Sequence, residues 1–193
     1  MLSTYYYKGV PFIHDFVITR NHYIFHQAPI ELDITNILLG MKGPVETMKF
    51  RSDLKSKFYI VPRDVNKEIE IVEVDPHFVF HYANAYEDEN GVLIFDGFKC
   101  ETLQIGITDS SDANTPWVQL DYSKTVPFPL LTRFTLAPSN TGKWEFFQRK
   151  LSPSCLDFPA INPTKVGKDY RYVYSSVGSD PVKSSPFQGL VMA

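Results

Sequence analysis

Short runs of alternating apolar and polar side chains follow one another along most of the chain, with turn residues between them. Asn90-Gly91 separates one pair of runs, and Asn-Gly is a strong hairpin signal because both residues tolerate positive φ. Arg20-Asn21 separates another pair. The pattern predicts three antiparallel hairpins, formed by residues 11–19 with 22–28, 78–86 with 92–98, and 130–137 with 143–151.

Outside the hairpins, further short runs are typical of strands. These are residues 57–62, 68–74, 156–161, 170–175 and 187–193. One helical pattern is found, over residues 30–41, where Ile30, Ile34, Ile37, Leu38 and Met41 share a face. Residues 104–129 lack periodicity and predict a long loop, and the tyrosines at 5–7 are typical of a strand. The expectation is an all-β protein with very little helix: a sandwich, a barrel or a propeller.

Composition narrows the classes of function. The 193 residues are 44% hydrophobic, which suits one globular domain with its own core. A formal net charge of −3 and the lack of a basic run argue against nucleic-acid binding. Cys100 and Cys155 have no CxxC spacing, so free thiols are expected. No apolar run approaches the roughly 20 residues of a membrane-spanning helix.

Three polar residues interrupt apolar strand patterns: His14, His81 and Asp157. Two histidines and a carboxylate are typical of a non-haem Fe(II) site. The alternative for each histidine is an ordinary hydrogen-bonded position in a sheet. The remaining histidines have structural interpretations. We expect His22 at a solvated strand end, His26 hydrogen-bonded within a sheet, and His77 at a rim position.

Four segments occur in an order that resembles the carotenoid cleavage oxygenase family, above all its apocarotenoid oxygenases. They are FIHDFVIT at 12–19, IVPRD at 60–64, FVFHYANAYED at 78–88 and DFPAINPTKVGKDYRYVY at 157–174. The resemblance implies a seven-bladed β-propeller with one Fe(2+) on its axis, held by four histidines. It also implies that dioxygen is activated there to cleave a double bond of a carotenoid or apocarotenoid into two carbonyl products.

The resemblance assigns roles residue by residue. His14 and His81 match two of the iron ligands, and Asp157 matches a glutamate that orients a ligand histidine from outside the metal's own shell. Asp is one methylene shorter than Glu, which leaves open whether the carboxylate reaches the imidazole directly or through a shift or a water. Tyr82 stands where many members have a histidine that is not a ligand. The acidic corner from Asn84 to Asp88 is expected to be structural.

The family's other two ligand histidines have no counterpart, because no histidine precedes His14 and none follows His81. We therefore expect residues 1–193 to be the central part of a single propeller domain, three to four blades, with its N- and C-terminal parts absent. The first functional hypothesis is the iron-dependent dioxygenase. The alternatives are an inactive truncated fragment and a non-enzymatic propeller that binds an apocarotenoid.

An apolar substrate needs an apolar path to the metal. Phe25, Phe80 and Phe98 are candidates for the lining of a substrate tunnel. The apolar face of residues 30–41 has two interpretations: packing on the sheet, or peripheral contact with a membrane that supplies the substrate. The compartment stays open between cytoplasm and plastid.

Overall fold

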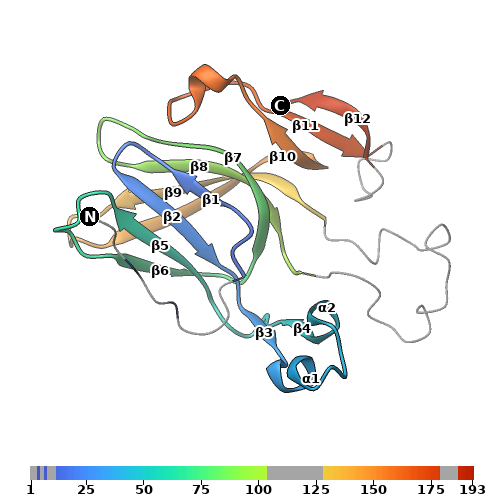
Figure 1. Cartoon of the computed structure of the whole chain (residues 1–193). Helices are drawn as coiled ribbons and strands as arrows, with labels where there is room; N and C mark the ends of the chain where they lie inside the picture. Colours follow the sequence, from blue (N-terminus) through green and yellow to red (C-terminus); the bar gives the residue numbers. More distant parts are fainter. Residues whose placement is uncertain (1–3, 5–6, 8–11, 104–127, 179–186) are drawn as a thin grey trace.

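Two antiparallel sheets dominate the computed structural model of the chain, which describes residues 4, 7, 12–103, 128–178 and 187–193 (Figure 1). The first sheet has the order β1-β2-β5-β6. Its strands are β1 (Phe16–Ile18), β2 (His22–Gln27), β5 (Ser56–Pro62) and β6 (Glu70–Val74). The hairpin predicted over residues 11–28 forms here, with Phe16 opposite Phe25 and Ile18 opposite Tyr23.

The second sheet has the order β12-β11-β10-β9-β8-β7. Its strands are β7 (Phe78–Glu87), β8 (Leu93–Cys100), β9 (Leu130–Pro138), β10 (Trp144–Ala160), β11 (Tyr174–Gly178) and β12 (Phe187–Met192). The strand β10 pairs first with β9 and, after a register shift between Lys150 and Cys155, runs on to pair with β11. The runs predicted separately at 143–151 and 156–161 are therefore one strand shared by two groups of strands.

Four-stranded antiparallel sheets that follow one another along the chain are the blades of a β-propeller. β1-β2-β5-β6 is one blade, β7-β8-β9-β10 a second, and the end of β10 with β11 and β12 begins a third. The all-β prediction is confirmed, and the chain is part of a propeller. The predicted hairpins of β7 with β8 and of β9 with β10 are also present.

The core lies where the first two blades face each other. Phe58 and Ile60 of β5 are buried in one cluster with Phe95 of β8 and Phe134 of β9. The Phe58 ring lies 5.3 Å from that of Phe95 and 5.9 Å from that of Phe134, centroid to centroid. Aromatic side chains on alternate strand positions thus bury one face of each sheet, as the alternation predicts.

The helix predicted over residues 30–41 is wrong in its extent. The segment contains β3 (Ile30–Leu32) and the short helix α1 (Ile34–Leu38). Asp33 caps α1 by accepting a hydrogen bond from the Asn36 N–H, so the helix begins after it. Ile30 is buried in β3, opposite Phe50, instead of lying on a helical face.

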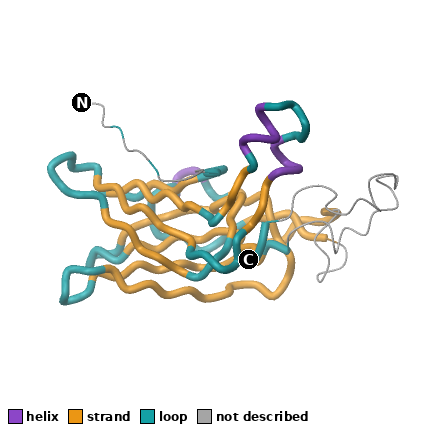
Figure 2. Tube along the Cα trace, turned by 90° about the horizontal axis from the view of Figure 1, so that it is seen from below, coloured by secondary structure: helices purple, strands orange, loops and turns teal. Residues whose placement is uncertain are grey.

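Four elements form a small subdomain, which we call the insertion: β3, α1, α2 (Pro44–Thr47) and β4 (Met48–Phe50). It protrudes at one end of the sheets (Figures 1 and 2). Its helices are short, and no helix in the described ranges is long and apolar enough to cross a membrane.

The strand predicted at 170–175 begins later, because β11 starts at Tyr174. The Tyr170 hydroxyl instead donates to Asp96 Oδ2 at 2.6 Å, and Arg133 holds both oxygens of this buried carboxylate. Residues 170–173 therefore link a 3-10 turn (Pro163–Lys165) to the sheet. The strand predicted at 187–193 is confirmed by β12. The loop predicted at 104–129 and the tyrosine run at 5–7 lie largely outside the described residues.

Candidate metal centre

His14 lies just before β1 and reaches the backbone of β7. Its Nδ1 donates to the Phe80 carbonyl oxygen at 2.8 Å. Its ring lies 5.1 Å from the His81 ring, centroid to centroid, with an interplanar angle of 85°. The structure thus brings together two predicted ligands that are far apart in sequence.

His81 lies in the middle of β7, and its Nδ1 donates to Asp157 Oδ1 at 2.8 Å. The same carboxylate oxygen accepts the Phe158 N–H at 2.8 Å. The Asp157 side chain is 9% exposed and the His81 side chain 28%. The shorter aspartate therefore reaches the imidazole directly.

Each of these imidazoles uses Nδ1 as a donor, and a neutral imidazole carries only one N–H. Nε2 of both rings is then unprotonated and has a lone pair for a metal ion. Two imidazoles at neighbouring positions of one ion, each with a metal–nitrogen bond of about 2.1 Å, have ring centroids about 4.6 Å apart. The observed 5.1 Å and near-perpendicular rings are close to that arrangement, so the pair fits two ligands of one ion. Within the described ranges, no group of three or more metal-binding side chains is found.

Burial sets the electrostatics of Asp157. Loss of water raises the pKa of this carboxyl group, and the hydrogen bonds from His81 and Phe158 partly offset the rise. Nearby His14 also favours the charged form. The carboxylate and its imidazole therefore depend on each other: the ring supplies the donor that the buried acid needs, and the acid fixes the ring's tautomer.

The strand is distorted where it carries Asp157. Phe158 has φ of +55°, the left-handed region, and precedes Pro159, which further restricts it. Between Asp157 and Ala160 the pairing with β11 shifts by one residue, which is a β-bulge. The Phe158 ring lies 5.2 Å from the His81 ring. Backbone strain is thus concentrated next to the histidine pair.

The polar residues that follow His81 on β7 hold neighbouring segments in place. Asn84 Nδ2 donates to the carbonyls of Lys165 and Lys168, and its Oδ1 accepts the Gly167 N–H.

Glu87, at the end of β7, accepts hydrogen bonds from the side chains of Thr19, Asn21 and His22. The expectation that this corner is structural fits these contacts. The prediction of a solvated His22 is wrong, because its Nδ1 lies 2.9 Å from Glu87 Oε1 in a partly buried position.

His26 and His77 form a second pair, inside the core. Their rings are stacked 4.3 Å apart at 15°. His77 is 1% exposed, so the predicted rim position is wrong: the chain after Asp75-Pro76 enters the core directly. His26 lies in a sheet, on β2, as predicted, but the predicted hydrogen bond is not found at its Nε2: this atom and His77 Nε2 both lack a partner among the residues that the structure describes.

The sequence reasoning did not single out Asp15. Its Oδ1 accepts the Phe16 N–H at 2.8 Å, and its Oδ2 accepts the Tyr82 N–H at 2.8 Å. The available signal was its place beside His14. The Tyr82 ring packs directly on Gly97 of β8. A side chain at position 97 would not fit, because its Cβ would lie 2.6 Å from the Tyr82 ring. The tyrosine therefore packs against β8, and its contact with Asp15 is through the backbone.

The three phenylalanines predicted to line a substrate tunnel lie in three different places. Phe98 is fully buried in a core cluster with Leu131, so it does not line an open path. Phe80 contacts the His14 ring at 5.3 Å, and Phe25 stacks on Phe16.

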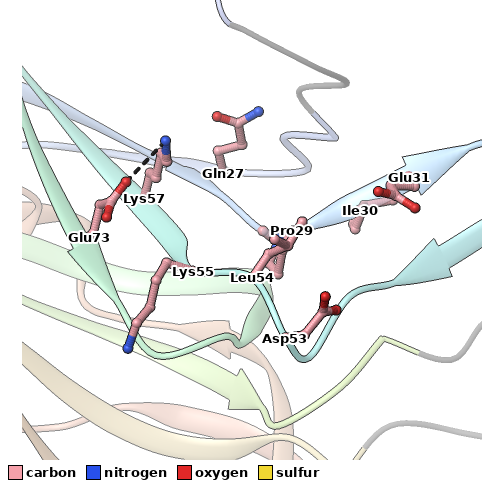
Figure 3. Close-up of a pocket in the computed structure, with 10 residues that line it drawn as sticks. Gln27, Pro29, Ile30, Glu31, Asp53, Leu54, Lys55, Lys57 and Glu73 are labelled. Carbon is pink, nitrogen blue, oxygen red and sulfur yellow. Dashed lines mark ion pairs between the residues drawn. The ribbon is translucent and has the colours of Figure 1, made fainter.

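A cavity of about 510 Å³ lies at the base of the insertion (Figure 3). None of its lining residues belongs to the histidine site. Several are charged, including the ion pair of Lys57 with Glu73, whose Nζ and Oε1 atoms lie 3.1 Å apart. An apolar polyene would leave these charges without water, so the cavity is a poor substrate pocket.

Comparison with known proteins places the chain in a family. The family model described as retinal pigment epithelial membrane protein matches residues 2–193. Apocarotenoid-15,15'-oxygenase of Synechocystis sp. is 34% identical over 186 residues, which are 96% of this chain and 36% of that protein. Isoeugenol monooxygenase of Pseudomonas putida is 32% identical over 171 residues, 88% of this chain and 33% of that protein.

A solved structure agrees. The crystal structure of cobalt-substituted Synechocystis ACO superimposes with a TM-score of 0.83 at 31% identity, covering 96% of this chain and 36% of that one. The chain thus spans about a third of the length of the relatives it matches. The family match over nearly all of its residues and the shared architecture lead to one conclusion: the chain belongs to the retinal pigment epithelial membrane protein family, the carotenoid cleavage oxygenases.

Proposed function

We propose that this chain belongs to an iron(II)-dependent dioxygenase that cleaves a carbon–carbon double bond of a carotenoid or apocarotenoid to carbonyl products. The observation that carries the proposal is the pairing of His14 with His81, each with Nδ1 bound to an oxygen and Nε2 left for a metal. Family membership and the Synechocystis relative support the type of reaction. When bound, Fe(2+) would supply the binding and activation of dioxygen.

The chain's own residues have defined parts in this proposal. His14 and His81 hold the ion, and the Phe80 carbonyl keeps the His14 ring in one tautomer. Asp157 does the same for His81 and adds negative charge behind the ring, which makes the imidazole a stronger donor. The Phe80 ring lies 5.3 Å from the His14 ring and the Phe158 ring 5.2 Å from the His81 ring, and these rings would offer apolar contacts to a polyene.

The test uses the natural gene product that contains these residues, purified with Fe(2+) and incubated with a C30 or shorter apocarotenal under air. We expect two carbonyl products by liquid chromatography and mass spectrometry, and none from the His81→Ala variant. Retention of the apocarotenal without products would favour the non-enzymatic binder. A protein that neither retains iron nor binds the apocarotenal would favour the inactive fragment.

A second substrate class has its own support. Isoeugenol monooxygenase is 32% identical to this chain over 171 residues, and the apocarotenoid oxygenase is 34% identical over 186 residues. Isoeugenol therefore forms a parallel arm of the same incubation. Turnover of isoeugenol alone would move the proposal from polyenes to small aromatic substrates with the same metal site.

We also propose that the insertion makes a peripheral contact with membranes. Ile34, Leu38, Leu39 and Met41 are exposed on and after α1, and Leu38 is 80% exposed. Apolar side chains gathered on a protruding element suit an interfacial contact. The double variant Ile34→Ser/Leu38→Ser is expected to lose sedimentation with phosphatidylcholine vesicles, whereas Val65→Ser, exposed in the β5–β6 connection, keeps it. Equal sedimentation of all three proteins would contradict the contact.

A further inference from the structure

The backbone around His81 is not fixed in the way that the rest of β7 is. β7 pairs regularly with β8 at Phe78 and Val79, and again from Asn84 onward. Between Val79 and Tyr82 the register shifts, and it shifts again between Tyr82 and Asn84. His81 therefore lies in a double bulge, within which Tyr82 is the one residue that stays opposite a residue of β8, Gly97.

Two consecutive residues contact β7 at this double bulge. His14 donates from its ring to the carbonyl of Phe80, the residue before His81. Asp15 accepts, with Oδ2, the N–H of Tyr82, the residue after His81. The peptide groups on both sides of His81 are thus held by neighbouring side chains of one segment.

We infer that Asp15 is a positioning residue for the metal site, an inference that rests on the function proposed above. Its carboxylate fixes the Tyr82 peptide, while the adjacent His14 ring binds the Phe80 peptide. The two contacts together set the position of His81 relative to His14. Asp15 acts through the backbone and does not itself touch the ion.

The use of both carboxylate oxygens explains why an acid stands at this position. Oδ1 accepts the Phe16 N–H and Oδ2 the Tyr82 N–H, each at 2.8 Å. An asparagine has one accepting oxygen and would turn an N–H toward one of these donors. The arrangement matches that of Asp157, which also accepts the N–H of the following phenylalanine while it binds the His81 side of the site. Two Asp-Phe pairs therefore brace the same histidine, one through its backbone and one through its ring.

The test measures binding of Co(2+) alone to the metal-free natural gene product, by calorimetry and visible absorption. Asp15→Asn is expected to raise the dissociation constant about 10-fold, the lower end for loss of an outer partner of a ligand. Asp88→Asn is the control for the chemical change itself, because Asp88, on the same hairpin, accepts the N–H groups of Asn90 and Val92 with Oδ1 alone. The control should keep both its thermal stability and its cobalt affinity, because the one accepting oxygen that Asp88 uses is still present in asparagine. A folded Asp15→Asn protein that binds cobalt as tightly as the wild type overturns the inference.

Two further measurements keep the outcomes distinct. His14→Ala and His81→Ala must each weaken cobalt binding; if neither does, the proposed metal site fails, whatever Asp15 does. Amide hydrogen exchange of the unsubstituted protein serves if Asp15→Asn does not fold. The Tyr82 amide is expected to exchange slowly although it lies in the bulge, and exchange as fast as in a free peptide overturns the role of Asp15.

Discussion

Two pairs of histidines lie on the first two blades, and they differ in almost every physical respect. His14 and His81 meet edge to face, 5.1 Å apart at 85°, near the surface of the described chain. His26 and His77 are stacked 4.3 Å apart at 15° in the core, against the rings of Phe58 and Phe134. Closeness alone therefore does not distinguish a metal site from a packed core.

The distinguishing feature is what each ring nitrogen can do. In the first pair both Nδ1 atoms have oxygen acceptors from other segments, which leaves both Nε2 atoms unprotonated. In the second pair the parallel rings cannot direct their lone pairs to one point between them. Burial also lowers the pKa of His26 far below its usual value, and that of His77 to about 4. The core pair is thus held neutral by desolvation, as two packed rings.

The largest expected difference between the pairs is in metal binding. His14→Ala or His81→Ala should weaken Co(2+) binding by more than about 100-fold, because a direct ligand is worth more than an outer partner. His26→Phe, which preserves the stacked ring, should bind as the wild type does. Titration calorimetry of the three variants checks this, and a cobalt affinity that depends on His26 would reverse the assignment of the two pairs.

The pH dependence of stability should come from the core pair. Because the pKa of His77 is lower in the folded than in the unfolded state, the unfolded chain takes up the proton first as the pH falls. Stability is complete above the unfolded value of about 6.5 and falls toward pH 4, by about 1.4 kcal/mol per pH unit for each histidine.

The variant His77→Phe should make this dependence shallower in urea unfolding measured from pH 7 to pH 4, with the contribution of His26 remaining. The charged groups around His77, which are Asp75, Lys99 and Glu101, remain in that variant. An unchanged slope would mean that other groups take up the protons.

A smaller effect separates the charge of Asp157 from its shape. Asp157→Asn keeps an oxygen that can accept from His81 but removes the negative charge behind the ring. We expect the cobalt affinity of Asp157→Asn to fall about 10-fold. Asp157→Glu should bind cobalt nearly as the wild type does, because it keeps the negative charge. If the asparagine and glutamate variants bind equally, the contribution of Asp157 is geometric alone.

The smallest expected effect concerns the strain at Phe158. Both Phe158→Gly and Phe158→Ala remove the ring, but only glycine adopts positive φ without cost. The glycine variant should therefore be more stable than the alanine variant by about 1 kcal/mol in denaturant unfolding, the reverse of the usual order within a strand. The usual order would mean that the bulge relaxes when the ring is removed.

Sequence periodicity predicted the strands well because alternation reports directly on burial in a sheet, as at Phe58, Phe95 and Phe134. It failed at residues 30–41. The apolar residues there have the spacing of one helix, but Ile30 lies in β3 and Ile34 lies in α1. The motif resemblance pointed to His14, His81 and Asp157, but composition and spacing alone left them open.

Other features depend on tertiary contacts that periodicity does not report. His77 looked like a strand entry because it follows Pro76, yet packing places it among aromatic rings. The role of Asp15 depends on the double bulge of β7, where its side chain accepts the backbone N–H of Tyr82.

The most direct test of the contrast between the pairs is nitrogen-15 NMR of the histidine rings, with Co(2+) added stepwise to the metal-free natural gene product. Before addition, His14 and His81 should show a protonated Nδ1 and a bare Nε2. With cobalt, the paramagnetic ion should broaden the signals of these two rings first and leave those of His26 and His77 sharp until higher occupancy. Broadening of the stacked core pair before the edge-to-face pair, or of no histidine at all, would contradict the account.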